Sequence, residues 1–308
     1  MKKHLSLLLT FILIANIVTP ASAINMEDGE GQVGLNETSV CSEYEMVLKQ
    51  MQSENVPYSI NDQSNPISKY IHTISERATL PVETLQEYGY SDKQINLLKK
   101  YNDGTLTFEQ IAYATSANLT TTLTAPNHTS SVYTVVYSWS WDVLPSGTGE
   151  DSAALVLMGV NNNSAGIQTE FLATAANVYY YYSDGSQYKV ESPTVSVKDS
   201  GASTKFIIYK QDDVQSRWVW AKKGSITAQI KPVSSSSSFV AVKARGEFAH
   251  TGPSTNARIQ SIEFSADFKN MKFSVKFTLT PDSTGSVTVM GAKQYVFHND
   301  GSVVKEQS

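Results

Sequence analysis

The chain has 308 residues, of which 41% are hydrophobic and 17% are charged, and its formal net charge is −5. This apolar content is enough to build a sizeable core and excludes a wholly disordered chain, while a single Cys excludes a disulfide scaffold. The excess of acidic residues argues against a nucleic-acid-binding protein, which needs Lys and Arg to contact phosphates.

Residues 1–23 have the pattern of a secretory signal peptide. Lys2 and Lys3 precede an apolar run from Leu5 to Val18, and Ala21-Ser22-Ala23 forms a small-x-small cleavage site. The apolar run is shorter than the roughly 20 residues of a membrane-spanning helix. We therefore expect a secreted protein, extracellular or associated with the cell wall. The signal is similar to those of Gram-positive bacteria, a resemblance that implies export and nothing about activity.

The part of the chain that follows the signal peptide is acidic. From Ile24 to Ala125 there are 14 acidic and 6 basic residues, a net charge of −8, whereas Pro126 to Ser308 carry 15 acidic and 16 basic residues. We expect residues 24–61 to be largely flexible, apart from a short helix from Ser42 to Ser53. This uneven charge, together with a change in composition, places a domain boundary near residue 125.

Residues 62–115 carry the start signals of several short helices. Pro66 and Pro81 stand at first-turn positions, and Ser91 with Gln94 forms a capping box. These signals predict a small helical module of three or four helices. The Thr/Ser-rich stretch 116–131 that follows is predicted to be a linker.

Beyond Ser131 the hydrophobic period changes from 3.6 residues to 2, which is typical of β-strands. Short runs of this kind recur as far as Phe297, separated by turn signals such as Ser183-Asp184-Gly185 and Asn299-Asp300-Gly301. Because no helical period intervenes, the sequence predicts an antiparallel β-sandwich over residues 132–308. The predicted fold class is α+β by domain, a helical module followed by an all-β sandwich.

The sequence contains partial motifs for cofactor and metal binding, but the residues in and around them do not fit those functions. The G-x-G-x-x-G of Gly29 to Gly34 follows no strand, and the EF-hand-like loop 99–110 has Lys99 and Tyr101 where carboxylates belong. Neither H-E-x-x-H nor G-x-S-x-G occurs. We predict no cofactor and no metal and name no catalytic residue. A catalytic site can still assemble from distant residues, and a His near paired acids in a pocket would point to one.

Aromatic residues cluster on three predicted strands. Trp139 and Trp141 share one strand face, Trp218 and Trp220 repeat their spacing, and a run of four Tyr places two rings on each face. Ring faces with a polar edge suit sugars, and packing in the sandwich core is the alternative role. The candidate ligand-binding residues are Trp139, Trp141, Tyr179, Tyr180, Tyr181, Tyr182, Trp218 and Trp220.

These features favour a secreted, non-enzymatic binding protein of the cell envelope or extracellular space, with a glycan or protein as its partner. An alternative comes from Ser225 to His250, where two alternating runs flank the polar turn Ser234–Ser238. This segment resembles the membrane-inserting hairpins of β-pore-forming toxins, and the resemblance implies a membrane-active protein with an acidic helical pro-segment. A secreted hydrolase is the third alternative.

Overall fold

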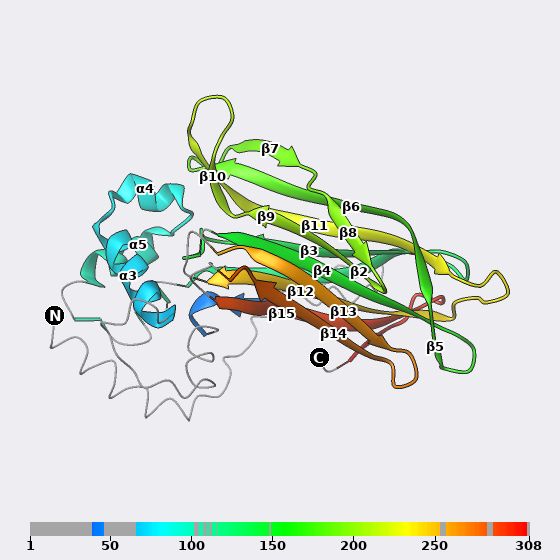
Figure 1. The fold of residues 1–308 in the computed structure, drawn as a ribbon. Helices are drawn as coiled ribbons and strands as arrows, with labels where there is room; N and C mark the ends of the chain where they lie inside the picture. The colour runs from blue at the N-terminus through cyan, green and yellow to red at the C-terminus, as the bar shows by residue number, and fades with distance from the viewer. Residues whose placement is uncertain are drawn as a thin grey trace, which may run out of the picture.

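The structure is a computed structural model, and it describes residues 39–45, 66–101, 105–106, 110, 113–114, 116–147, 149–252, 257–281 and 286–306. The predicted signal peptide and most of the segment 24–61 lie outside these residues. The described part consists mainly of antiparallel strands in two large sheets that face each other, with three helices at one end (Figure 1). The predicted antiparallel sandwich is confirmed.

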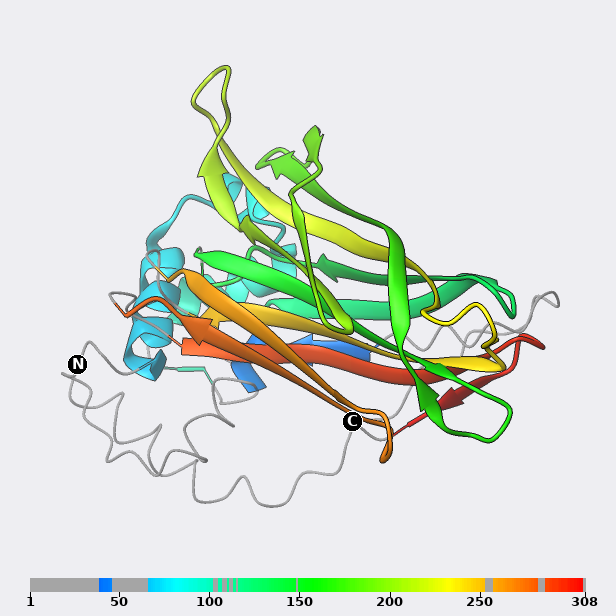
Figure 2. The same ribbon diagram turned by 45° about the vertical axis from the view of Figure 1, so that its right-hand side comes forward.

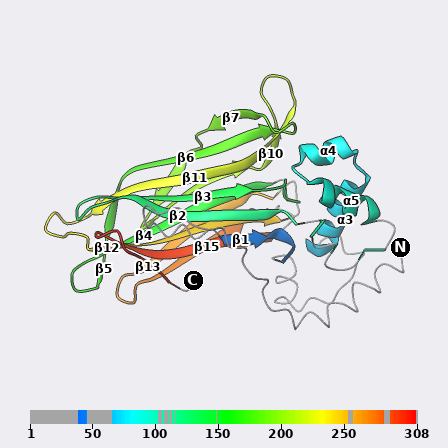
Figure 3. The same ribbon diagram turned by 180° about the vertical axis from the view of Figure 1, so that it is seen from behind.

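The first large sheet has seven strands in the order β1-β2-β3-β11-β6-β7, with β10 also paired to β11. Figure 3 shows this sheet from behind, with β6, β11, β3 and β2 running side by side. The strands are β1 (Ser39–Ser42), β2 (Asn118–His128), β3 (Tyr133–Trp141), β6 (Thr169–Tyr182), β7 (Gln187–Glu191), β10 (Tyr209–Gln211) and β11 (Trp218–Pro232).

The second large sheet has the order β16-β15-β12-β4-β9-β8, with β5 also paired to β4. Two further strands form a separate hairpin that lies along the outer face of this sheet (Figure 2). The strands of the sheet are β4 (Glu150–Val160), β5 (Gly166–Ile167), β8 (Val195–Lys198), β9 (Gly201–Ile207), β12 (Ala241–Gly252), β15 (Ser286–His298) and β16 (Val303–Lys305); those of the hairpin are β13 (Ile259–Asp267) and β14 (Lys272–Leu279).

The core lies between the two large sheets and is rich in aromatic rings. Along β3 every second side chain is buried, as the sequence period predicts. The Trp139 ring stacks on Phe206 of the opposite sheet at 5.2 Å. The hydroxyls of Tyr133 and Tyr137 donate to the carbonyls of Phe297 and Gly291 across the core, at 3.1 and 3.0 Å. These bonds satisfy the polar edges of buried rings and join the two sheets.

The stretch 116–131 is not an irregular linker, because Asn118–His128 form β2 between β1 and β3. The side chains of Leu119, Thr121 and Leu123 are buried, and the residues between them are half-buried. Thr is β-branched and suits the exposed face of a strand as well as a loop, so the many Thr residues of this stretch do not distinguish a strand from a linker. Whether residue 125 divides two domains stays a prediction.

The predicted hairpin from Ser225 to His250 does not form. Its first run belongs to β11, between β3 and β6 of the first sheet, and its second run belongs to β12, between β4 and β15 of the second sheet. The Ser-rich turn Ser234–Ser238 therefore lies on a crossover between sheets. The alternation in both strands reflects a core face and an outer face, and it gives no support to membrane insertion by this segment.

Three of the helices before β2 lie fully within the described residues, namely α3 (Pro66–Thr79), α4 (Val82–Glu87) and α5 (Asp92–Lys100). The capping box of Ser91 and Gln94 is present at the start of α5. Gly89 follows α4 with a φ of +91°, and a Cβ there would meet the carbonyl oxygen of Asp142 at 2.8 Å, so glycine permits this close approach. Among the described helices, none is both long and apolar enough to cross a membrane.

Candidate functional site

A groove of about 370 Å³ lies between α4 and the neighbouring ends of β6 and β11. This volume is within the usual range of small-molecule sites, roughly 300–1,000 Å³. One wall comes from the acidic helix and the other from aromatic and polar residues of the first sheet. The lining residues are Glu83, Gln86, Glu87 and Gly89 on the helical side and Tyr181, Tyr182, Ser183, Asp184, Gly185, Trp220 and Lys222 on the sheet side.

Strand register explains why two of the aromatic residues meet in this groove. Trp220 of β11 stands directly opposite Tyr181 of β6, and residues directly opposite in an antiparallel pair share a face. The register then shifts between Ala221 and Lys223, which marks a β-bulge at Lys222. The Lys222 ammonium lies 5.5 Å from the centre of the Trp220 ring. The groove therefore has aromatic rings with a cation beside them.

The turn after β6 adds a carboxylate to the sheet side. Asp184 accepts a hydrogen bond from the Ser186 amide at 2.8 Å and forms an ion pair with Arg217 at 3.1 Å. The hydrogen bonds of Ser186, with the hydrogen bond and charge of Arg217, hold the pKa of Asp184 below its ordinary value. Asp184 is thus an ionised acceptor, and the Arg217 charge is already partly neutralised.

The opposite wall presents hydrogen-bonding groups from one helix face. Glu83, Gln86 and Glu87 stand three and four positions apart on α4, so their side chains project from the same side. Sequence analysis missed these residues, although their spacing was a readable signal. The sequence does not show that this face lies opposite β6, about 95 positions further along the chain, and β11, about 130 positions further along.

The eight aromatic candidates from the sequence fall into three groups by position. Trp139, Trp141 and Tyr180 are buried in the core between the sheets, so their prediction as ligand contacts is not supported by their positions. Tyr181, Tyr182 and Trp220 line the groove, although Trp220 is only 2% exposed. Of the other two, Tyr179 is half-buried and Trp218 is 49% exposed, stacked on Tyr209 at 4.6 Å.

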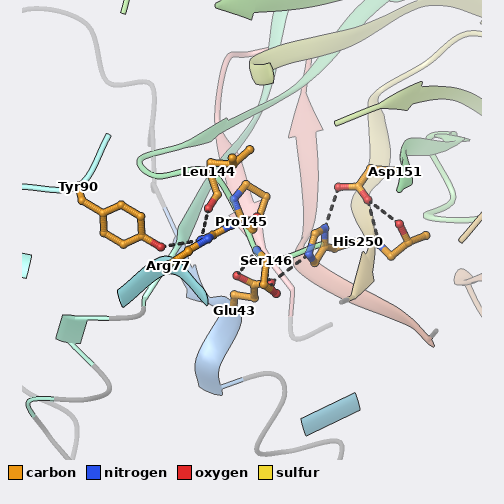
Figure 4. A network of polar contacts seen from close by, with 9 residues as sticks. Glu43, Arg77, Tyr90, Leu144, Pro145, Ser146, Asp151 and His250 are labelled. Atoms are coloured by element: carbon orange, nitrogen blue, oxygen red, sulfur yellow. Dashed lines mark hydrogen bonds and ion pairs between the residues drawn. The ribbon is translucent and has the colours of Figure 1, made fainter. Parts of the chain in front are cut away.

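Arg77 of α3 holds the helices against the sandwich. Its guanidinium donates to the carbonyl oxygens of Leu144 and Pro145 at 2.8 and 2.6 Å and to the Tyr90 hydroxyl at 2.6 Å (Figure 4). The Leu144 amide in turn donates to the carbonyl of Tyr88 at 3.0 Å. These bonds join the loop after β3 to both α3 and the segment that follows α4. The acidic wall of the groove is therefore fixed relative to the aromatic wall.

A buried charged cluster lies on the other side of the same loop (Figure 4). The Ser146 amide donates to both carboxylate oxygens of Glu43 at 3.0 Å, and the Ser146 hydroxyl also bonds to Glu43. His250 contacts Glu43 through Nε2 at 3.4 Å and Asp151 through Nδ1 at 2.9 Å. Asp151 also accepts a bond from the Thr251 amide at 2.9 Å. Glu43, which comes from the acidic part of the chain, is thus buried in the core of the sandwich.

The charges in this cluster stabilise one another. Burial alone would lower the pKa of His250, but the charges and hydrogen bonds of Asp151 and Glu43 outweigh it and raise the pKa to about 10. Burial alone would raise the pKa of Glu43, but His250 and Ser146 outweigh it and lower this pKa. His250 is therefore an imidazolium that donates to two carboxylates.

This arrangement tests the hydrolase alternative. A His near paired acids in a pocket would support that alternative. His250 lies between two acids, yet it is 2% exposed and both ring nitrogens contact carboxylates. No nitrogen of the ring is left to act on a substrate. Within the described ranges, no group of His, Cys, Asp and Glu side chains has a metal-binding arrangement.

Comparisons with known proteins give no family for this chain. No family model matches it, and no curated protein matches it. Among solved structures, the collagen-binding subdomain of the Enterococcus faecalis surface protein ACE is 8% identical with a TM-score of 0.25, over 51% of this chain and 92% of that one. A structure concerned with pH-induced modulation of Streptococcus parasanguinis adhesion by Fap1 fimbriae is 9% identical with a TM-score of 0.20, over 58% and 78%. Likenesses with such low TM-scores support no conclusion about function.

Proposed function

We propose that this protein is a secreted, non-enzymatic binding protein whose groove holds a glycan of the cell envelope or extracellular space. One observation carries the proposal, which is that the half-buried Tyr181, with the buried Trp220 beside it, lies across the groove from Glu83, Gln86 and Glu87. A sugar ring has an apolar face and a rim of hydroxyls. Aromatic rings suit the apolar face, and carboxylates and amides accept and donate hydrogen bonds at the rim.

The charges of the groove narrow the class of glycan. Glu83, Glu87 and Asp184 line it together with one cation, Lys222. An anionic polysaccharide would meet like charges at close range, which is unfavourable. The groove therefore suits a neutral or amino-substituted glycan, whose hydroxyls donate hydrogen bonds to the carboxylates of the groove.

The state of Asp184 favours binding over glycoside hydrolysis. A glycosidase needs a carboxylic acid with a raised pKa to protonate the leaving oxygen. The pKa of Asp184 is lowered by Ser186 and Arg217, so this group is not a proton donor near neutral pH. The lowered pKa therefore excludes Asp184 as the acid of a glycosidase, and as an ionised carboxylate it accepts hydrogen bonds.

Titration of the full chain with a panel of neutral and amino-substituted envelope polysaccharides, followed by Trp fluorescence, tests the proposal. We expect one polysaccharide to change the emission, and we expect Tyr181→Ala and Glu83→Gln each to weaken its binding about tenfold, equivalent to about 1.4 kcal/mol. Tyr113→Ala, which removes an exposed ring outside the groove lining, is the matched control and should bind normally. Equal affinity in all three variants would rule out the groove as the binding site.

A further inference from the structure

The hairpin of β13 and β14 stands apart from the two large sheets. In the described part of the chain, these two strands form a ladder with each other and with no other strand. The hairpin is inserted between β12 and β15, which are neighbours in the second sheet. It lies over the outer face of that sheet as a third layer, against β4 and β9 (Figure 2).

The register of the hairpin separates apolar from polar residues completely. On one face the opposite pairs are Ile262 with Phe277, Phe264 with Val275, and Ala266 with Phe273. On the other face the opposite pairs are Glu263 with Lys276, Ser265 with Ser274, and Asp267 with Lys272. Because the charged pairs are of opposite sign, the polar face carries no net charge.

Most of the apolar bulk at this contact belongs to the hairpin and little belongs to the sheet beneath. Phe264 packs on Ala154 and Val156 of β4, and Phe273 and Phe277 pack around them. A Cβ at Gly201 of β9 would clash with the Phe264 ring, so glycine makes room for it. If the hairpin left, its phenylalanine rings would leave with it, and the sheet would expose Ala154 and Val156 of β4.

Hydrogen bonds at its base and at its turn hold the hairpin to the sandwich. Lys205 donates to the carbonyl of Ile259 at 2.6 Å, the Ile259 amide donates to Glu150 at 3.0 Å, and Lys243 donates to the carbonyl of Met271. The Glu150 amide also donates to the carbonyl of Ala257, just before the hairpin, at 3.0 Å. Release of the hairpin would therefore break no strand ladder, and its own backbone bonds would stay intact.

We propose that β13 and β14 form a membrane-inserting hairpin, which leaves the second sheet and enters a lipid bilayer with its apolar face toward the lipid. The length fits, because the Thr280 amide donates to the Arg258 carbonyl at 2.9 Å and extends the pairing to residues 258–267 and 272–280. A strand needs about 9–11 residues to cross a bilayer. The free strand edges require partners in lipid, and hairpins from further copies of this chain supply them.

A reversible tether tests this proposal. In a Cys41→Ser background, Gly201→Cys with Phe264→Cys places two thiols at the contact where a Cβ on Gly201 would meet Cγ of Phe264, so that a disulfide can join the hairpin to β9. We expect the unmodified chain to release dye from vesicles of phosphatidylcholine and phosphatidylglycerol. Because Phe264 belongs to the apolar face, the variant is compared only with itself, and we expect its oxidised form to release none and its reduced form to release dye. Release by the oxidised variant, or no release by the unmodified chain, would overturn the proposal.

A second measurement determines which face of the hairpin contacts the lipid. Val275→Cys and Ser274→Cys, each in the Cys41→Ser background, place an environment-sensitive fluorophore on the apolar or the polar face. On adding the same vesicles, we expect a blue shift and quenching by an acyl-chain quencher at position 275 and neither at position 274. Equal responses at both positions, or none at either, would contradict insertion. Tyr181→Ala should release dye normally, so failure of the groove proposal would be distinguishable from failure of this one.

Discussion

At the scale of single residues, the cluster of Glu43, His250 and Asp151 has the greatest consequence for stability. These groups are nearly inaccessible to water, so each charge depends on the others for its solvation. Because Glu43 also bonds to Ser146, the cluster joins the segment 39–45 to the loop after β3. Only the fold brings together residues as far apart in sequence as Glu43 and His250.

Glu43→Gln should lower the free energy of unfolding by about 3–5 kcal/mol, because it leaves the buried imidazolium with one carboxylate instead of two. Urea unfolding followed by near-ultraviolet circular dichroism measures the change. Glu83→Gln, at an exposed position of α4, is the matched control and should change the free energy by less than about 0.5 kcal/mol. Similar urea midpoints for the two variants would show that the cluster is not a major source of stability.

The same cluster predicts a pH dependence of stability. The pKa of His250 is raised from 6.5 to about 10, so its contribution is complete below pH 6.5 and is lost as the pH rises toward 10. The pKa of Glu43 is lowered from 4.5, so its contribution is present above pH 4.5 and is lost as the pH falls through the lower, folded value. We expect the urea midpoint to be highest between these limits and to fall from pH 6.5 to 10, in the unmodified chain and in the control His298→Gln. A midpoint that stays constant over this interval would contradict the assignment.

At the scale of elements, the sequence predicts strands better than it predicts their partners. The alternating run of residues 272–279, one of the short runs beyond Ser131, coincides with β14, because alternation is a local property. Pairing is not local, and so β11 and β12 were expected to form a hairpin and instead joined opposite sheets. The sequence does contain one signal of an additional layer, because the run from Ala153 to Val160 is continuously apolar. An antiparallel strand with that composition needs cover on both faces, and in β4 the outer cover is the β13–β14 hairpin.

The contact between the helices and the sandwich leads to a prediction for Arg77. Arg77→Met removes the donors to Leu144, Pro145 and Tyr90 while keeping an apolar side chain of similar length. We expect the segment of α3 to α5 to become sensitive to limited proteolysis while the strands stay resistant, because the helices lose their anchor on the loop. Lys93→Met, at an exposed position of α5, is the control and should be cut at the rate of the unmodified chain. Unchanged resistance of the Arg77 variant would show that packing alone holds the helices.

At the scale of the whole molecule, the acidic and near-neutral parts of the chain contribute to one site. The net charge of −8 between Ile24 and Ala125 led us to place a domain boundary near residue 125, and all candidate ligand-binding residues lay beyond it. The structure instead places α4 opposite Tyr181 and Trp220. Sequence reasoning found the aromatic wall because ring spacing is visible in a strand, and it missed the acidic wall because helix docking depends on distant bonds such as those of Arg77.

Export is a separate prediction about the whole chain, and it rests on residues outside the described part. We expect the mature protein in a culture supernatant to begin at Ile24, because cleavage is predicted after Ala23. N-terminal sequencing of the secreted protein measures this directly. A protein that keeps Met1 and stays with the cells would contradict it.

If both walls of the groove bind one glycan together, hydrogen exchange of the full chain will register the ligand on both of them. With a saturating glycan from the neutral and amino-substituted panel, we predict slower amide exchange in both 83–89 and 181–186, because the ligand bridges α4 and the turn after β6. Tyr181→Ala should show no slowing in either segment at the same glycan concentration. Slowing confined to a different surface, or to one of the two segments alone, would contradict the account.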